Sequence, residues 1–345
     1  MKPFPYLTAV VIAVSFCCAS TAYANDSLSS FNNYKIAFIE KALAHKTTLG
    51  VSKNGKAIEG FYFPGKSGKK ALVIAGVHGS ELSGIEVARQ LVNELMHDTA
   101  REFSTLVIPC LFIDNALMAA GAPAQIGSVK NLGRYTTSGA VDPNRQMPSP
   151  GKAYDPATGI DHLHRSIEKE NALLLQIIAA FKPERIVSIH AIRDTSRAGI
   201  YADPRTDAKG YALGFGADSV LAIRMASYIS TSGGTAPGNL LPQKPNAKYP
   251  SDPSIVNVGE KQPRAACGSL LPGNVGCGIS LGTWATTAVA DNDDPANNRD
   301  AITLITMEFP GSKRTVDYDA PTDIEACKKN VHAYAGCIKE VFLKN

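Results

Sequence analysis

Alternation between two kinds of segment is the feature that most restricts how this chain can fold. Short apolar runs rich in β-branched residues are separated by longer runs with helical periodicity. The strand-like runs are residues 69–76, 104–112, 184–190 and 301–309, and the helix-like runs are residues 82–96, 162–181, 218–229 and 321–342. Apolar runs without polar alternation are typical of strands that are covered on both faces. The pattern therefore predicts the α/β class, with a mainly parallel sheet flanked by helices.

Two long stretches, residues 113–160 and 231–300, have no clear periodicity and are rich in Gly, Pro, Ala and Asn. Loops of this length in a compact domain are usually functional or disordered. Neither internal repeats nor a linker divides the chain, and its 44% of apolar residues is enough for a substantial core. We therefore expect a single domain with long active-site loops. The modest net charge of +4, without a basic block, argues against nucleic-acid binding.

The N-terminus has the features of a secretory signal peptide. Lys2 is followed by an apolar run at residues 6–19 and by the small-x-small sequence AYA at residues 22–24. The apolar run is too short to span a bilayer comfortably. These features predict removal of residues 1–24 and a periplasmic or secreted domain of residues 25–345. A buried N-terminal helix is the alternative.

The cysteines fit an oxidising compartment. Cys267 and Cys277 flank SLLPGNVG, whose Pro and Gly residues allow a loop to close, so we predict a disulfide between them. In one continuous C-terminal helix, Cys327 and Cys337 would lie roughly 15 Å apart. Bonded cysteines need Cα atoms within about 7 Å, so these two can pair only if that helix breaks. Cys110 lies in an apolar run and is expected to be a buried thiol.

The sequence HGSE directly follows the first strand-like run. His78 should emerge at the carboxyl end of that strand, where open α/β sheets bind ligands. Glu81 falls at the start of the next helix, where the helix dipole favours a carboxylate. Its carboxylate can turn toward the same point as the imidazole, and His with Glu is a ligand set that suits zinc. For this fragment alone, an ordinary strand-to-helix turn is the competing interpretation.

A second strand-terminal histidine supplies a third ligand. His190 ends the run ERIVSIH, and a core histidine with a satisfied hydrogen bond is the alternative for this residue taken alone. Together, His78, Glu81 and His190 form a His₂Glu set that leaves a fourth position open for water, as in catalytic zinc sites. The remaining histidines are poorer candidates, because two would point apart on a helix (His162 and His164) and three stand alone in helical contexts (His45, His97 and His332).

Glu308 is an acid inside the otherwise apolar run LITMEFP. A bare carboxylate there is costly unless it is paired, coordinated or functional. Burial would raise its pKa toward the range that suits a general base. A salt bridge to a nearby arginine is the alternative.

Cationic residues in the first long stretch could bind a substrate. Asn144 and Arg145 adjoin a proline in VDPNRQMP, and the planar guanidinium group matches a carboxylate. Arg134 in LGRYTTSG could steady the oxyanion of a tetrahedral intermediate. A turn with an exposed arginine is the alternative.

The combination of these motifs resembles the zinc carboxypeptidase family, also called funnelins. An HxxE after a strand, an Asp-x-Asn-Arg turn, a strand ending in His and a late Thr-x-Glu strand occur in that order within residues 70–312. The resemblance implies one αβα domain around a mixed sheet. It also implies one zinc ion bound by His78, Glu81 and His190, with Glu308 as the general base.

The same resemblance implies roles for the cationic residues of the first long stretch. The sequence also departs from the family's usual pattern at several places. Asn144 and Arg145 would hold the substrate's carboxylate, and Arg134 would be the electrophilic arginine. The family's substrate-capping tyrosine has no clear counterpart; Trp284 lies near that place and is our candidate, with a core tryptophan as the alternative. DPNR replaces the commoner DLNR, and the stretch 231–300 is longer than usual.

Three further features are similar to the bacterial murein peptide amidase and cell-shape carboxypeptidase branch, namely SIHA, AGIYADP and SLGTW. They imply a cell-wall peptide substrate, cut at D-glutamate or diaminopimelate, and leave endo- or exopeptidase action open. A deacylase of small N-acyl amino acids, like aspartoacylase or succinylglutamate desuccinylase, shares the HxxE…His set and the Asn-Arg turn. A non-catalytic module that binds wall peptides is a further alternative. No membrane span is expected after signal cleavage.

Overall fold

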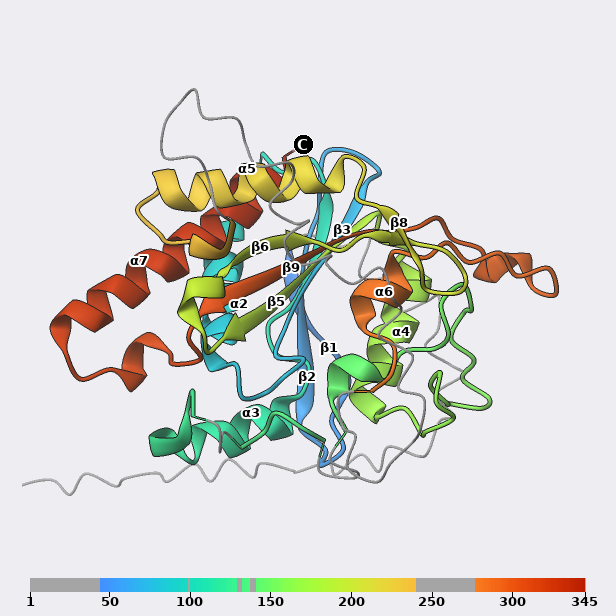
Figure 1. Ribbon diagram of the computed structural model, residues 1–345, viewed down its shortest axis with the longest axis horizontal. Helices are drawn as coiled ribbons and strands as arrows, with labels where there is room; N and C mark the ends of the chain where they lie inside the picture. The colour runs from blue at the N-terminus through green and yellow to red at the C-terminus, as the bar shows by residue number, and fades with distance from the viewer. Residues whose placement is uncertain (1–43, 99, 129–131, 137–140, 240–276, 345) are drawn as a thin grey trace, which may run out of the picture.

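Seven strands form one mixed sheet in the centre of the structure, a computed structural model that describes residues 44–98, 100–128, 132–136, 141–239 and 277–344 (Figure 1). In spatial order the strands are β1 (His45–Val51), β2 (Ala57–Phe63), β4 (Ser104–Ile108), β3 (Lys70–Ala75), β5 (Arg185–Ile192), β9 (Thr303–Pro310) and β6 (Gly199–Ala202). The four strands β4, β3, β5 and β9 are parallel, and β1, β2 and β6 pair antiparallel with their neighbours. The predicted α/β class with a mainly parallel sheet is confirmed.

Helices cover both faces of this sheet and give the three layers of an αβα domain (Figure 1). One face carries α2 (Leu82–Leu95), α5 (Asp218–Thr231) and α7 (Pro321–Cys337), and the other carries α4 (Lys169–Phe181) and the short α6 (Leu281–Ala285). Successive side chains of a strand point to opposite faces, so each central strand contributes to both cores. In β5, for example, Val187 packs on the α2 side and Ile186 on the α4 side.

The strands β1, β2 and β6 were not predicted. β1 reads HKTTLGV, and Leu49 is its one fully buried residue, whereas buried positions alternate along β2. Strands near the edge of a sheet need no continuous apolar run, so the pattern that identifies the central strands does not detect them. His45, expected in a helical context, is the first residue of β1. A separate two-stranded sheet pairs β7 (Arg205–Thr206) with β8 (Ala212–Gly214).

The helix predicted over residues 162–181 begins only at Lys169. His162 and His164 therefore do not lie on a helix, contrary to the prediction. His164 has a φ of 58°, in the left-handed region that a right-handed helix excludes. The helical periodicity thus holds only for the later residues of the predicted range.

Two other segments refine the predicted boundaries. The helix α3 (Ile113–Ala120) lies at the start of the stretch 113–160 that was expected to be irregular. The predicted C-terminal helix 321–342 is present as α7, which continues directly into a π-helical turn at Ile338–Phe342. No helix within the described ranges is long and apolar enough to cross a membrane.

Cysteine positions agree with the predictions that can be examined. Cys110, Cys327 and Cys337 are buried free thiols, and burial raises the pKa of Cys110 to about 12. Cys277 is disulfide-bonded, but its predicted partner Cys267 lies outside the described residues, so this pairing stays a prediction. The predicted signal peptide also lies outside the described residues, as do residues 240–276 of the second long stretch.

Candidate metal centre

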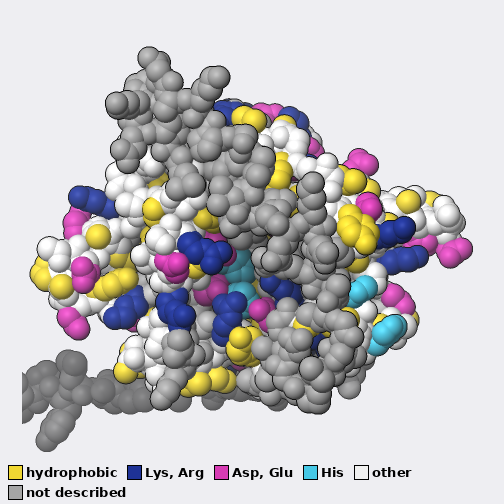
Figure 2. Space-filling view, viewed as in Figure 1, with side chains coloured by type: hydrophobic (Ala, Val, Ile, Leu, Met, Phe, Trp, Pro, Cys, Tyr) yellow, Lys and Arg dark blue, Asp and Glu magenta, His cyan; other side chains and the backbone are white. Residues whose placement is uncertain are grey.

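Two neighbouring parallel strands bring the predicted ligands to one edge of the sheet. β3 ends at Ala75 and β5 runs beside it, with Ala75 opposite Ile189. His78 follows β3 by three residues, and His190 lies near the carboxyl end of β5. Near the middle of Figure 2, histidine and acidic side chains lie in a hollow bordered by Lys and Arg side chains. The predicted position at the carboxyl ends of the strands is thus observed.

The side chains of His78, Glu81 and His190 converge, and each residue is only 4% exposed. One ligand atom from each lies within 4.8 Å of the others. Glu81 Oε1 is 2.8 Å from His78 Nδ1, Glu81 Oε2 is 3.0 Å from His190 Nδ1, and the two Nδ1 atoms are 3.2 Å apart. Two imidazole nitrogens and a carboxylate oxygen are a donor set that zinc accepts. These residues therefore fit a bound metal ion.

The far nitrogen of each imidazole is held by another side chain. Asp142 Oδ1 lies 2.8 Å from His78 Nε2, and the Ser188 hydroxyl lies 3.0 Å from His190 Nε2. Such outer partners fix the orientation of a ligating imidazole and the nitrogen that it presents. Here they leave Nδ1 of both His78 and His190 directed at Glu81.

Asp142 was not singled out from the sequence, although it begins the DPNR turn. It precedes the short 3-10 helix Pro143–Arg145 and is buried, and its Oδ1 also accepts a hydrogen bond from Asn144 N at 2.8 Å. The sequence signal for Asp142 is an acid that immediately precedes a proline-fixed turn, within the first long stretch expected to carry functional loops.

The local backbone explains how Glu81 reaches the histidines. Glu81 is the residue just before α2, but its side chain makes no capping hydrogen bond. Its Oε2 instead accepts a hydrogen bond from Ala191 N at 3.2 Å. A Cβ at Gly79 would lie 2.4 Å from Ala116 N of α3, so only glycine allows this turn to pack so closely. The sequence likewise places Glu81 at the start of the helix-like run 82–96.

Charges within this cluster are strongly coupled. Although burial disfavours the charged form, Glu81 and Asp142 raise the pKa of His78 to about 9. Burial likewise opposes ionisation of the two acids, but the histidines hold the pKa of Glu81 well below its ordinary value. The contact with His78 lowers the pKa of Asp142 to about 2. The imidazole of His78 thus lies between the carboxylates of Glu81 and Asp142.

Arg134 joins the same cluster from the first long stretch. Its Nη1 donates to Glu81 Oε1 at 3.0 Å, and its Nη2 lies 3.7 Å from Asp142 Oδ2. Its side chain is 41% exposed, so the guanidinium group lies at the mouth of the site. The two carboxylates raise its pKa despite partial burial. The sequence prediction placed Arg134 at the site, and the structure brings it into contact with a candidate ligand.

Glu308 lies one strand away from His190. The two residues are directly paired between the parallel strands β5 and β9, and both lie on the α4 side of the sheet by strand alternation. Burial, reinforced by the charge of Glu81, raises the pKa of Glu308 to about 6 in spite of the nearby cations. No salt bridge to Glu308 occurs within the described part of the chain, which disfavours the predicted alternative of an arginine partner.

The remaining predicted site residues are divided between two places. Asn144 and Arg145 are half-buried next to Asp142 and so lie beside the cluster. Asn144 Oδ1 accepts a hydrogen bond from Leu281 N at 3.0 Å, which ties the turn to α6. Trp284 is 2% exposed in the α4-side core, and its indole donates to Lys152 O at 2.8 Å. The structure does not bring Trp284 together with Glu81 or Glu308, and the alternative of a core tryptophan describes its position.

A family model matches part of the sequence, and several solved structures are similar to the structure. A family model described as the Succinylglutamate desuccinylase/Aspartoacylase catalytic domain matches residues 67–111, which include His78 and Glu81. Comparison with curated protein sequences finds no match.

Solved structures are similar over most of the chain. The murein-tripeptide amidase MpaA from Escherichia coli O157 has 17% sequence identity and a TM-score of 0.43, covering 89% of this chain and 95% of that chain. The carboxypeptidase A from Helicoverpa armigera has 15% identity and a TM-score of 0.46, covering 89% of this chain and 72% of that chain.

Proposed function

We propose that this protein is an exported zinc-dependent hydrolase that cleaves a peptide bond in cell-wall peptides, at D-glutamate or diaminopimelate. The observation that carries the proposal is the buried convergence of His78, Glu81 and His190, with Glu308 paired to His190 on the next strand. Such a combination of a metal-ligand set and an acid of raised pKa is what hydrolysis at neutral pH requires.

Each residue has a distinct task in this reaction. His78, Glu81 and His190 would hold one zinc ion, which when bound supplies Lewis-acid activation of water. Glu308, with its pKa near 6, is ionised at neutral pH and can take a proton and return it to the leaving amine.

Three cationic or amide groups orient the substrate. Arg134 lies at the mouth of the site, where its guanidinium group can stabilise the oxyanion that develops on the scissile carbonyl. Arg145, with Asn144 beside it, presents a group suited to a substrate carboxylate. These roles agree with those implied by the resemblance to zinc carboxypeptidases.

The proposed substrate and location rest on the sequence. The motifs SIHA, AGIYADP and SLGTW resemble the murein peptide branch, and the N-terminal features of a signal peptide support a location in the periplasm or outside the cell. A murein peptide is available in that compartment.

The test is digestion of a muropeptide mixture with zinc-loaded protein, followed by mass spectrometry. Loss of diaminopimelate or of D-alanine would identify the scissile bond. The variant Glu308→Gln is the matched control, because it keeps the size of the side chain and the three ligands. An unchanged mixture, or full activity of the variant, would refute the proposal.

A second candidate is a deacylase of small N-acyl amino acids. The match of residues 67–111 to the succinylglutamate desuccinylase/aspartoacylase family model favours it. The same zinc-loaded protein should then release free amino acid from N-acetylaspartate or succinylglutamate while leaving muropeptides intact. The non-catalytic module would bind wall peptides and leave both kinds of substrate unchanged.

A further inference from the structure

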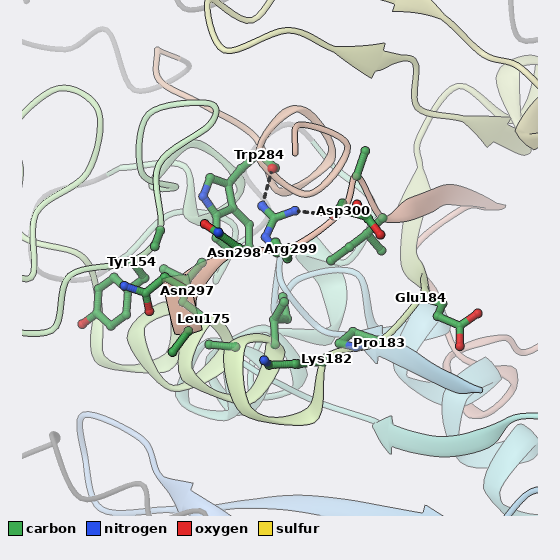
Figure 3. Close-up of a pocket in the computed structure, with 16 residues that line it drawn as sticks. Tyr154, Leu175, Lys182, Pro183, Glu184, Trp284, Asn297, Asn298, Arg299 and Asp300 are labelled. Carbon is green, nitrogen blue, oxygen red and sulfur yellow. Dashed lines mark hydrogen bonds between the residues drawn. The ribbon is translucent and has the colours of Figure 1, made fainter. Parts of the chain in front are cut away.

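A second cavity, of about 380 Å³, lies at the amino ends of β5 and β9, away from the carboxyl ends that carry the candidate metal centre. Figure 3 shows the residues that line it. Residues 182–184 line it just before β5, and residues 296–302 line it just before β9. The six residues from Glu184 to His190 span about 20 Å in a strand, so this cavity is separate from the metal ligands. Its volume falls within the range of about 300–1,000 Å³ that is usual for small-molecule sites.

The floor of this cavity is apolar. Leu175 and Ile178 of α4, Ile302 and the indole of Trp284 line it together. Tyr154 and Asn297 lie together at one end in Figure 3. Apolar walls with a few polar groups are typical of cavities that bind small organic molecules.

Arg299 supplies an unusual charge at this cavity. Its guanidinium group stacks on Trp284 at 4.3 Å, and its hydrogen bonds go only to main-chain carbonyl oxygens. No carboxylate forms an ion pair with it within the described part of the chain, and burial lowers its pKa to about 10. Its Nε is buried without a hydrogen-bond partner. A half-buried cation without a counter-charge raises the local positive potential.

Lys182 adds a second cation to the cavity wall. Its side chain lines the cavity, and Figure 3 shows its amino group on the cavity side. It forms no ion pair within the residues that the structure describes. Lys182 is exposed to solvent, as are two acids at the rim, Glu184 and Asp300. Figure 3 shows the Glu184 carboxylate directed away from the cavity.

We propose that this cavity binds a small organic anion with an apolar body, such as a medium-chain carboxylate. Its apolar part would lie against Leu175, Ile178 and Trp284, and its anionic group would face Lys182 and the charge of Arg299. A purely structural role for Arg299, in tying together the carbonyl groups after α6, accounts for its Nη hydrogen bonds. It does not account for an open apolar volume beside two unpaired cations.

Trp284 is the only tryptophan in the chain, so its fluorescence reports directly on this cavity. The experiment titrates the folded protein with octanoate and, in parallel, with 1-octanol as an uncharged probe of similar length. We expect saturable change in tryptophan emission with octanoate and weaker binding of 1-octanol. The result should be the same before and after treatment with a metal chelator, because the cavity does not involve the metal ligands.

Two variants with matched controls locate the site. Lys182→Gln should weaken octanoate binding about two- to fivefold, as expected for a partly exposed ion pair, without changing the binding of 1-octanol. Ala179→Phe, which fills the cavity from α4, should abolish binding of both probes. The controls Lys328→Gln and Ala320→Phe change exposed residues of or beside α7, on the other face of the sheet.

Three results would overturn the proposal. One is unchanged tryptophan emission at millimolar octanoate. Another is binding of octanoate that survives Ala179→Phe, which would place the ligand elsewhere. The third is equal affinity for octanoate and 1-octanol, with no effect of Lys182→Gln, which would remove the preference for an anion. Arg299 is not varied, because loss of its carbonyl contacts could unfold the segment after α6.

Discussion

His190 and Glu308 are direct partners across the parallel strands β5 and β9. This pairing places the third candidate ligand, His190, next to the candidate base, Glu308, on adjacent strands. Because the main-chain hydrogen bonds of two central strands fix it, the separation of the two side chains does not depend on loop conformation.

Replacement of Glu308 by glutamine should abolish most of the turnover. General acid–base catalysis contributes roughly 10²–10⁴-fold, and the amide cannot take a proton at neutral pH. Zinc content, measured by elemental analysis after dialysis, should equal that of the unchanged protein because all three ligands remain. A variant that lost its zinc instead would show that Glu308 belongs to the ligand set.

The activity should rise with pH through about pH 6. Burial raises the pKa of Glu308 to about 6, and the base acts only in its ionised form, whose fraction increases as the pH rises through that value. The measurement is kcat/KM against pH with fully zinc-loaded protein. The residual activity of Glu308→Gln should lack this acidic limb; if both proteins show the same limb, another group is responsible.

Asp142→Asn should weaken zinc binding about 10–100-fold, the usual effect of removing a carboxylate behind a ligating histidine. The carboxylate contacts His78 Nε2 at 2.8 Å, so its loss removes a constraint on the imidazole. Competition with a chromophoric chelator measures the affinity. Asp161→Asn is a control acid in a separate ion pair with Arg165, and it should leave zinc binding unchanged.

Arg134→Met should bind zinc more tightly while losing turnover. In the structure Arg134 donates to Glu81 Oε1, and the same carboxylate would have to bind the zinc ion. The positive charges of the guanidinium group and of the metal ion would repel each other. The same chelator competition applies, with the exposed Arg193→Met as the control for a general change in charge. A decrease in zinc affinity would show that Arg134 supports the ligand Glu81 rather than competing for it.

Gly79→Ala should destabilise the protein by about 1–3 kcal/mol, the usual cost of overpacking. The added Cβ would lie 2.4 Å from Ala116 N, so α3 must move away from the HGSE turn. Urea denaturation of metal-free protein measures the change. Gly68→Ala is the matched control, because a Cβ there meets nothing within 4 Å.

The sequence predicted the central strands and the ligand triad because both depend on strong local signals. Continuous apolar runs identify β3, β5 and β9, and His78 and His190 follow from where those runs end. Strands β1 and β2, at one side of the sheet, gave no such signal, because their pairing with a neighbour, rather than their own burial, makes them strands. Local patterns do not record pairing between distant segments.

Contacts between distant turns were equally hidden. The approach of Asp142 to His78 joins residues 64 positions apart, and the approach of Arg134 to Glu81 joins residues 53 apart. No periodicity links such residues. The placement of Trp284 beside Arg299, away from the metal ligands, likewise depends on how the segment after α6 folds back onto α4.

The three candidate ligands come from two separate strands, so the candidate metal centre depends on the pairing of those strands. His78 and Glu81 are set in place by the end of β3, whereas His190 reaches them only after β5 has paired with β3. Before β5 pairs with β3 the three donors are not assembled, so in the proposed zinc enzyme the complete ligand set would exist only in the folded sheet.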